Sequence, residues 1–269
     1  MAEPGARSIW LIADDYGFSP GVSETIRTLL AAGHLSGTGC MTLFDDWSSE
    51  ARALAAIGGP FAVGMHLTLT DFPALSTGRT MPNLKRLLAS HDAKTIGIEA
   101  DAQLDRFREA FGQDPEFIDG HQHVHFLPAV RGWLARRFAD RSMSERPWLR
   151  GSPTLRAVPA LVKAKVVVAR LLARGFDAEM RRHGFVVEGP LCGFYDWRRP
   201  GAFARALDLF MDKAPDGAVV MCHPGTVDDV LRQRDVFTDA RHEERDALAS
   251  DAFPLRLQSA SLDLKRAAS

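Results

Sequence analysis

The sequence is poor in cysteine and in long apolar runs. Its 269 residues contain three cysteines, Cys40, Cys192 and Cys222, and no two of them have the close spacing of a zinc ribbon. A small, odd number also argues against a disulfide framework, so a reducing, cytoplasmic setting is the simpler interpretation. No stretch approaches the roughly 20 apolar residues that a membrane span requires. The N-terminus lacks the basic-then-apolar layout of a secretion signal.

The chain also lacks an excess of charge of either sign. A formal net charge of −1 gives no electrostatic footprint for nucleic acid or for an acidic membrane surface, so neither is expected as a partner. The composition, 46% hydrophobic and 25% charged, is ordinary for a soluble globular protein. The length favours a single domain over residues 1–269, and the sequence is compatible with a homo-oligomer.

Short β-type runs alternate with longer helical ones. The expected strands cover residues 9–13, 38–44, 61–70, 117–119, 148–150, 186–187 and 218–222. Ser19 and Pro20 precede an apolar-periodic stretch that closes at Gly33, which is typical of a capped helix with proline in its first turn. The alternation predicts an α/β fold with a mostly parallel sheet or barrel.

The segment of residues 161–182 is expected to form one long helix or two. Lys163, Arg170, Arg174 and Arg181 recur on one face at spacings of seven, four and seven. Beside an active site such a stripe could bind an anionic substrate. The Val and Leu residues on the other side favour an ordinary solvated helix face instead.

Polar side chains occur at or near the ends of four expected strands. They are Asp14 and Asp15 after 9–13, His66 within 61–70, His121 after 117–119, and His223 after 218–222. Ligands of parallel α/β folds sit at the carboxyl ends of the strands, so we expect the fold to gather these side chains. Carboxylate and imidazole ligands with a spare carboxylate are what metal-assisted hydrolysis needs.

The two carboxylates at the first strand end are adjacent. An isolated pair of this kind is as well explained by a turn or a helix cap. Consecutive side chains of an extended backbone diverge, so Asp14 and Asp15 cannot both point at one atom. One of them would therefore bind a metal while its neighbour handles a proton. Gly17 supplies the freedom to turn sharply afterwards.

The histidines have structural explanations as well. His66 lies in an apolar strand, where a hydrogen-bonded core histidine is the commoner case. His121, His123 and His125 would share one side of an extended segment. Three buried imidazoles are hard to satisfy without water or an ion, so we expect at least one of them to bind a metal.

The last candidate, His223, ends the most apolar late run of the chain. Pro224 and Gly225 force a turn where the ring emerges, and an imidazole presented this way can act as an acid or base near neutral pH. Cys222 could suggest a thiol nucleophile, but adjacent strand residues face opposite ways, so a buried core position is favoured.

Four stretches, in order, resemble the motifs of the YdjC-like carbohydrate deacetylases, a family distantly related to the NodB-type polysaccharide deacetylases. They are Ala13-Asp14-Asp15-Tyr16-Gly17, Gly64-Met65-His66-Leu67, Asp119-Gly120-His121-Gln122-His123-Val124-His125 and Cys222-His223-Pro224-Gly225. The motif-bearing region runs from about residue 9 to residue 225. The resemblance implies a distorted (β/α) barrel that removes acetyl groups from an N-acetylated sugar or glycoconjugate.

The resemblance also implies roles for five residues. One divalent ion, Mg²⁺ or Zn²⁺, would be held by Asp15, His66 and His121. Asp14 would be the general base and His223 the general acid.

Further residues are expected to support this site. The resemblance implies that Arg150 steadies a carboxylate and that the segment containing Phe194 lies on the substrate side. His123 and His125 have no role in that scheme, and we expect them to orient other groups or line the pocket. Aromatic residues near the motifs, for which core packing is the commoner use, are Phe18, Trp47, Phe72, Phe126, Phe194 and Trp197.

Three other functions use similar residues. Non-haem iron oxygenases share the two-histidine, one-carboxylate set, but that function leaves Asp14 and His223 unused and suits a different fold. A metal-dependent phosphoesterase commonly needs two ions and more carboxylates. A sugar-binding or regulatory protein that keeps the metal pocket without turnover is an alternative, against which the intact Asp14 and His223 argue. The sequence leaves open the identity of the acetylated substrate and of the metal.

Overall fold

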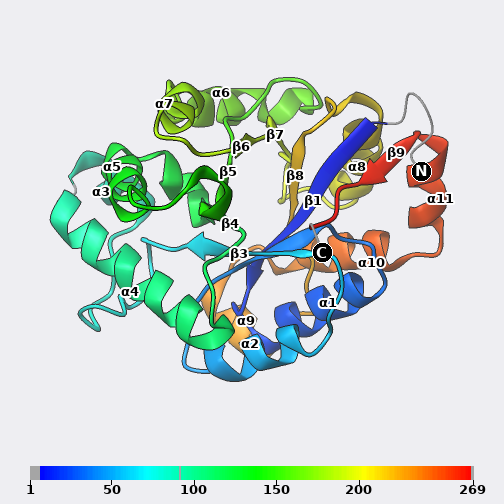
Figure 1. Ribbon diagram of the computed structural model, residues 1–269. Helices are drawn as coiled ribbons and strands as arrows, with labels where there is room; N and C mark the ends of the chain where they lie inside the picture. The colour runs from blue at the N-terminus through cyan, green and yellow to red at the C-terminus, as the bar shows by residue number, and fades with distance from the viewer. Residues whose placement is uncertain (1–6, 91, 268–269) are drawn as a thin grey trace.

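The computed structural model describes residues 7–90 and 92–267, in which nine strands form one curled sheet with helices around it (Figure 1). Every pairing between these strands is parallel, and their order is β6-β5-β4-β3-β2-β1-β8-β7, with β9 also paired to β1. The strands are β1 Arg7–Tyr16, β2 Gly37–Cys40, β3 Ala62–Leu67, β4 Phe117–Gly120, β5 Trp148–Arg150, β6 Val187–Glu188, β7 Leu191–Cys192, β8 Val219–Cys222 and β9 Leu262–Leu264.

The two ends of this strand order are joined by one short segment of chain. β6 pairs with β5 and β7 pairs with β8, and only Gly189 and Pro190 separate β6 from β7. Because one segment pairs on both sides, the sheet curls into a distorted barrel. The predicted fold class, an α/β protein with a distorted (β/α) barrel, is confirmed.

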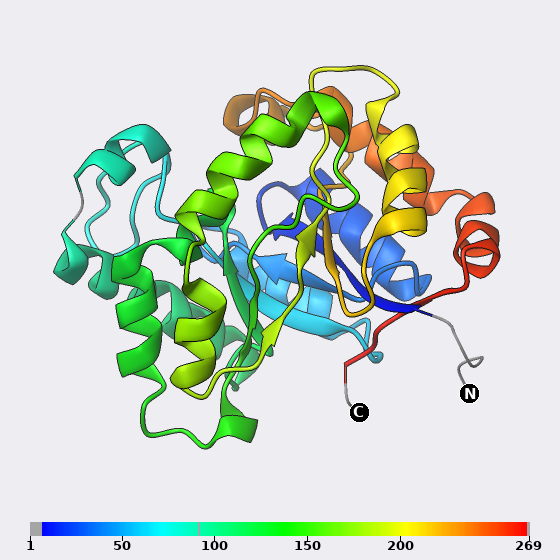
Figure 2. The ribbon, with the colours of Figure 1, turned by 90° about the horizontal axis from the view of Figure 1, so that it is seen from above.

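Helices surround the barrel (Figure 2). They are α1 Pro20–Ala31, α2 Trp47–Ala55, α3 Leu84–Ala89, α4 Ala93–Phe111, α5 Pro128–Arg137, α6 Lys163–Leu172, α7 Phe176–Arg182, α8 Ala202–Lys213, α9 Asp229–Arg234, α10 Thr238–Ala249 and α11 Ala252–Ser259, with short 3₁₀ turns at His121–Phe126, Met143–Glu145 and Ala160–Val162. None of the helices within the described ranges combines the length and apolar character that crossing a bilayer demands. The Oγ of Ser19 accepts a hydrogen bond from the backbone N–H of Val22, as the predicted cap of α1 requires.

Alternate strand residues point into the barrel, and the interior changes in character along it. At one end Trp148 stacks on Phe117 and Trp10, with ring centroids 4.5 and 5.2 Å apart. Gly64 leaves room for this stack, because a Cβ there would lie 2.4 Å from the Phe117 ring. Two residues further along the strands the inward positions become polar or charged. The pairs are Ile12 and Asp14, Gly64 and His66, Phe117 and Asp119, Trp148 and Arg150, and Met221 and His223.

The strand period of two residues therefore builds an apolar plug below and a polar site above. Burial of each large side chain in the plug stabilises the fold by about 1.5–3 kcal/mol. This stabilisation helps to offset the cost of burying the charged layer above the plug.

Three expected strand ends are wrong by three or four residues. β2 ends at Cys40 instead of residue 44, because the carbonyls of Leu43 and Phe44 accept hydrogen bonds from Arg106 on α4 and not from a neighbouring strand. β3 ends at Leu67, three residues before the expected end at residue 70. β1 extends to Tyr16, so both adjacent aspartates lie within the strand instead of after it.

Two short strands, β7 and β9, have no counterpart in the expected set. The segment of residues 161–182 forms two helices, as one of the two expectations had it. Lys163, Arg170, Arg174 and Arg181 are all exposed. The basic residues are thus exposed as expected, but the expected packing of the Val and Leu residues on a core is wrong for Val168 and Leu171, which are exposed too.

Candidate functional site

A cavity of about 460 Å³ opens where the strands end. Of the site residues predicted from the sequence, seven line this cavity: Asp14, Asp15, His66, His121, His123, Phe194 and His223. They come from four different strand ends and the segment after β7, so the fold brings them together as the parallel topology demands. Arg150 and His125 are buried and do not line the cavity.

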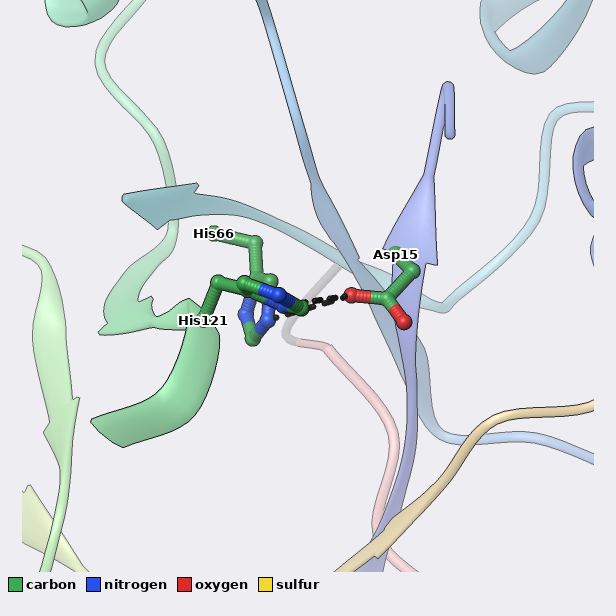
Figure 3. Close-up of side chains that lie close together, drawn as sticks. All are labelled: Asp15, His66 and His121. Atoms are coloured by element: carbon green, nitrogen blue, oxygen red, sulfur yellow. Dashed lines mark hydrogen bonds and ion pairs between the residues drawn. The ribbon is translucent and has the colours of Figure 1, made fainter. Parts of the chain in front are cut away.

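One carboxylate oxygen faces two imidazole rings (Figure 3). Oδ1 of Asp15 lies 3.4 Å from Nε2 of His66 and 3.2 Å from Nδ1 of His121. One ligand atom from each of these three residues lies within 4.8 Å of the others. The group is therefore compact enough for one small cation to contact all three.

Both His66 and Asp15 are oriented by a second contact. Nδ1 of His66 lies 2.6 Å from Oδ1 of Asp119, which turns Nε2 toward Asp15. Oδ2 of Asp15 accepts a hydrogen bond of 2.6 Å from Arg241, which leaves Oδ1 directed at the rings. In metal sites the second nitrogen of a ligand histidine commonly donates a hydrogen bond to a carboxylate, and a ligand carboxylate is itself held by a hydrogen bond.

The charges of the site also favour a cation. Three buried carboxylates, Asp14, Asp15 and Asp119, face two buried guanidinium groups. Burial lowers the pKa of His66, but the three carboxylates outweigh burial and raise that pKa to about 9. Burial would raise the pKa of Asp15, yet Arg241 and His121 hold it well below its usual range. The three carboxylates therefore favour a positive charge at His66, which either a proton or a metal ion can supply.

The backbone of β1 is distorted where the two carboxylates occur. Asp15 has φ of 69°, in the left-handed region that L-residues seldom adopt, and the pairing of β1 with β2 shifts register between Ala13 and Tyr16. The distortion lets Asp14 and Asp15 face the same cavity with different partners, as expected from their divergence.

Asp14 is paired with a buried arginine. Nη1 and Nη2 of Arg150 donate to its two oxygens at 2.7 and 2.5 Å, and Nη2 of Arg150 also contacts Asp119. Burial raises the pKa of Asp14, and the opposing effect of Arg150 does not cancel the rise. Burial also acts to raise the pKa of Asp119, but Arg150 and His66 bring it down to about 2.

A second group of potential donors consists of Asp14, His66 and Asp119. Arg150 already places its guanidinium against both of these carboxylates. A second metal ion would have to displace a buried cation, so the site favours a single ion.

His223 lies beside Asp14. Its Nε2 is 3.6 Å from Oδ2 of Asp14, and the ring of Trp197 packs against it with centroids 4.3 Å apart. Burial lowers the pKa of His223 well below its usual value. The charge of Asp15 acts to raise that pKa, but the charge of Arg241 lowers it further. The resting ring is therefore neutral.

Behind His223 lies a buried carboxyl group from α10. Glu244 accepts hydrogen bonds from the backbone N–H of His223 and, at 2.6 Å, from the hydroxyl of Tyr195. Burial raises the pKa of Glu244 to about 7, because the hydrogen bonds that Glu244 accepts and the charge of Arg241 only partly offset it.

This raised pKa makes stability depend on pH. Between the ordinary carboxyl pKa and about 7 the folded protein holds a proton on Glu244 that the unfolded chain releases, so the free energy of unfolding falls as pH rises through this range. We expect Glu244→Gln to remove that part of the pH dependence. Chemical unfolding of both proteins at several pH values measures it, and Glu243→Gln, at the neighbouring position of α10, is the control. An unchanged slope in Glu244→Gln would contradict the assignment.

The triple-histidine segment is not extended, so the prediction that its rings share one side is wrong. Residues His121–Phe126 form a 3₁₀ turn in which Gln122 and His123 have φ of 52° and 62°. His123 lines the cavity against Phe194, with ring centroids 5.4 Å apart. Burial lowers the pKa of His123 to about 3, and the charges of Arg150 and His66 add to that effect.

His125 turns away from the cavity. Its ring packs on Phe126 and Phe176, with centroids 3.9 and 5.6 Å apart. Neither ring nitrogen has a hydrogen-bond partner among the described residues. This side chain belongs to the core and does not line the pocket.

Aromatic rings form much of the cavity wall. Four rings singled out in the sequence line it, Phe18, Phe72, Phe194 and Trp197, together with Tyr195 and Phe237. Trp47 and Phe126 are buried in the core. Flat apolar faces beside fixed polar groups are typical of a pocket for a small organic ligand.

Sequence reasoning missed three residues of this site. Asp119 was quoted within a motif without a role, and Arg241 and Glu244 lie beyond the motif-bearing region. The only available signal for the last two is spacing, since Arg241, Glu244 and Leu248 share the buried face of α10.

The fold and the donor set define an α/β barrel with a candidate metal site at the carboxyl ends of its strands. The family described as YdjC-like protein matches residues 8–259, and the chain therefore belongs to that family.

Two similar relatives are named chitooligosaccharide deacetylase. The one from Citrobacter koseri is 27% identical over 250 residues, which cover 88% of this chain and 89% of the relative. The one from Salmonella newport is 27% identical over 234 residues, covering 82% of each. A crystal structure from Enterococcus faecalis, named for cellobiose-phosphate cleavage, is 18% identical, has a TM-score of 0.69 and covers 97% of both chains, which shows a shared fold.

Proposed function

We propose that the protein is a metal-dependent hydrolase that removes the acetyl group of an N-acetylated carbohydrate of the chitooligosaccharide type. One observation carries the proposal. A three-donor metal group, a buried carboxylate outside it and an imidazole beside that carboxylate share one aromatic-walled cavity. The names of the Citrobacter and Salmonella relatives support the choice of substrate class.

Asp15, His66 and His121 would hold the ion. When bound there, a divalent ion lowers the pKa of water and polarises the carbonyl of an amide. Two imidazoles and one carboxylate suit zinc better than magnesium, which prefers oxygen ligands. Arg241 and Asp119 contribute by fixing the directions of Asp15 and His66.

Asp14 would take the proton of the attacking water. Its pKa is raised by burial, which makes the carboxylate a stronger base than an exposed aspartate. Arg150 binds both oxygens of Asp14 and so holds the carboxylate in place beside the metal group.

His223 would pass a proton to the departing amine. The resting ring is neutral, so it can donate only after it has gained a proton, and the carboxyl of Asp14 lies 3.6 Å from its Nε2. The proton taken from water can therefore reach the amine through this pair. Water and the N-acetyl group yield acetic acid and a free amino sugar: one proton of the water reaches the amine, and the other stays on the acid until the acid ionises to acetate.

Release of acetate from an N-acetylglucosamine oligomer tests the function. We expect the purified protein to release acetate, to stop after incubation with a chelator, and to resume when Zn²⁺ or another divalent ion is returned. In His66→Gln, metal titration followed by calorimetry should show weakened binding, whereas His183→Gln, at an exposed histidine, should bind as the wild type does. A protein that binds metal and oligomer without releasing acetate would instead be a sugar-binding protein.

A further inference from the structure

Helix α6 and the turn before it expose an apolar stripe. Ala164, Val168 and Leu171 follow one another at spacings of four and three, which places them on one side of α6, and Leu161 precedes them in the 3₁₀ turn. Leu161, Val168 and Leu171 are 68%, 65% and 65% exposed. Val166, on the opposite side, is the buried residue of α6. A helix that exposes more apolar surface than it buries is unusual for a surface that only meets water.

Basic residues flank the stripe on both sides. Lys165 lies on one side, Lys163 and Arg170 lie on the other, and Arg174 follows in the turn after α6. All four are exposed, and none forms an ion pair with another described residue. Residues 146–176 contain no aspartate or glutamate, so this segment of the chain has one sign of charge.

The stripe lies next to the cavity. Lys165 is one of the lining residues, and Val166 packs with Val158, Val162 and the cavity residue Phe194. α6 lies at the outer edge of the molecule in Figure 1, and no other element covers it in the view from above in Figure 2. Whatever this face contacts would therefore lie close to the cavity mouth.

We propose that this face of α6, defined by the apolar stripe and the four basic residues, docks on an anionic phospholipid surface. An amphipathic helix with Lys and Arg beside an apolar face lies in the plane of a bilayer interface, with its apolar side chains among the headgroups and its cations against lipid phosphates. The net charge of −1 does not oppose this, because attraction acts over about 8 Å at physiological salt and depends on the local charge.

A second copy of the chain fits the face less well. A twofold contact would bring the same surface patch of both molecules together, and their unpaired cations would then face each other. Anionic lipid supplies the opposite charge that this face lacks. The inference concerns binding alone and does not depend on the proposed hydrolysis.

Sedimentation with lipid vesicles tests the proposal. We expect the full-length protein to bind vesicles of phosphatidylcholine mixed with phosphatidylglycerol, to bind pure phosphatidylcholine weakly, and to lose affinity as salt rises. Lys163→Glu/Arg170→Glu should lower the partition coefficient by at least about tenfold, because each basic residue near an anionic surface contributes roughly a factor of five. Val168→Glu/Leu171→Glu should lower it by at least about tenfold as well, because it removes two apolar side chains from the contact and adds two negative charges.

Matched controls lie elsewhere on the surface. Leu255→Glu on α11, where the side chain is 64% exposed, and Lys85→Glu on α3 should leave vesicle binding unchanged. All four α6 positions are exposed, so circular dichroism should show folded variants. Equal binding by the α6 variants and the wild type would overturn the proposal. So would a dimer in light scattering that Val168→Glu/Leu171→Glu dissociates, since the face would then be covered by a second copy.

Discussion

Replacement of Asp14 by asparagine is expected to lower kcat for acetate release by about 10²–10⁴-fold, the range that a positioned general base contributes. Asparagine is nearly isosteric and still accepts a hydrogen bond from Arg150, but it cannot take a proton from water. Asp14 is not in the compact donor group of Asp15, His66 and His121. Metal affinity, measured by calorimetry, should therefore change little.

The matched control is Asp105→Asn, the same chemical change at a 61%-exposed carboxylate on α4. It should retain wild-type kcat and metal affinity. Full activity of Asp14→Asn would remove the base assignment and leave the metal group intact. Loss of the metal together with activity would instead place Asp14 among the ligands.

The fold was predictable from the sequence because its signals are local. Ser19 and Pro20 mark the start of α1 wherever the helix packs, and apolar runs separated by helical segments imply parallel strands. The barrel interior follows from the same regularity, since period two links Trp148 to Arg150 and Phe117 to Asp119. The short strands β7 and β9 carry no such signal and exist only because a neighbour offers hydrogen bonds.

The candidate site was predictable only where it lies on these strand ends. Arg241 comes from helix α10, more than 200 residues after Asp15. The charged residues around it in α10 follow the pattern of an exposed helix. The direction of the histidines was also hidden, because two positive φ angles turn His121 and His123 toward the cavity and leave His125 in the core. Backbone strain of this kind depends on the surrounding fold.

Arg150 links the two layers of the site, since it contacts Asp14 at the base position and Asp119 behind His66. One guanidinium thus compensates two buried carboxylates. Its removal should affect folding more than any other single change in the charged layer, because the energy of an uncompensated buried charge exceeds that of a lost surface pair.

We expect Arg150→Met to lower the free energy of unfolding by about 3–5 kcal/mol at neutral pH in the metal-free protein. In the wild type, the pKa of Asp119 near 2 stabilises the fold above the ordinary carboxyl pKa, and this stability is lost as pH falls toward 2. Without Arg150, burial dominates and raises the pKa values of both Asp119 and Asp14, so the deficit of the variant should shrink in mild acid, where the carboxyls become neutral.

Urea unfolding with a chelator, at neutral and mildly acidic pH, measures this deficit. Arg156→Met, at an exposed arginine that forms no ion pair with residues 7–90 or 92–267, is the control and should change stability by less than about 0.5 kcal/mol. A stable Arg150→Met protein at neutral pH would mean that the carboxylates are compensated by other groups. The positioning of Asp14 by this arginine would then need a different explanation.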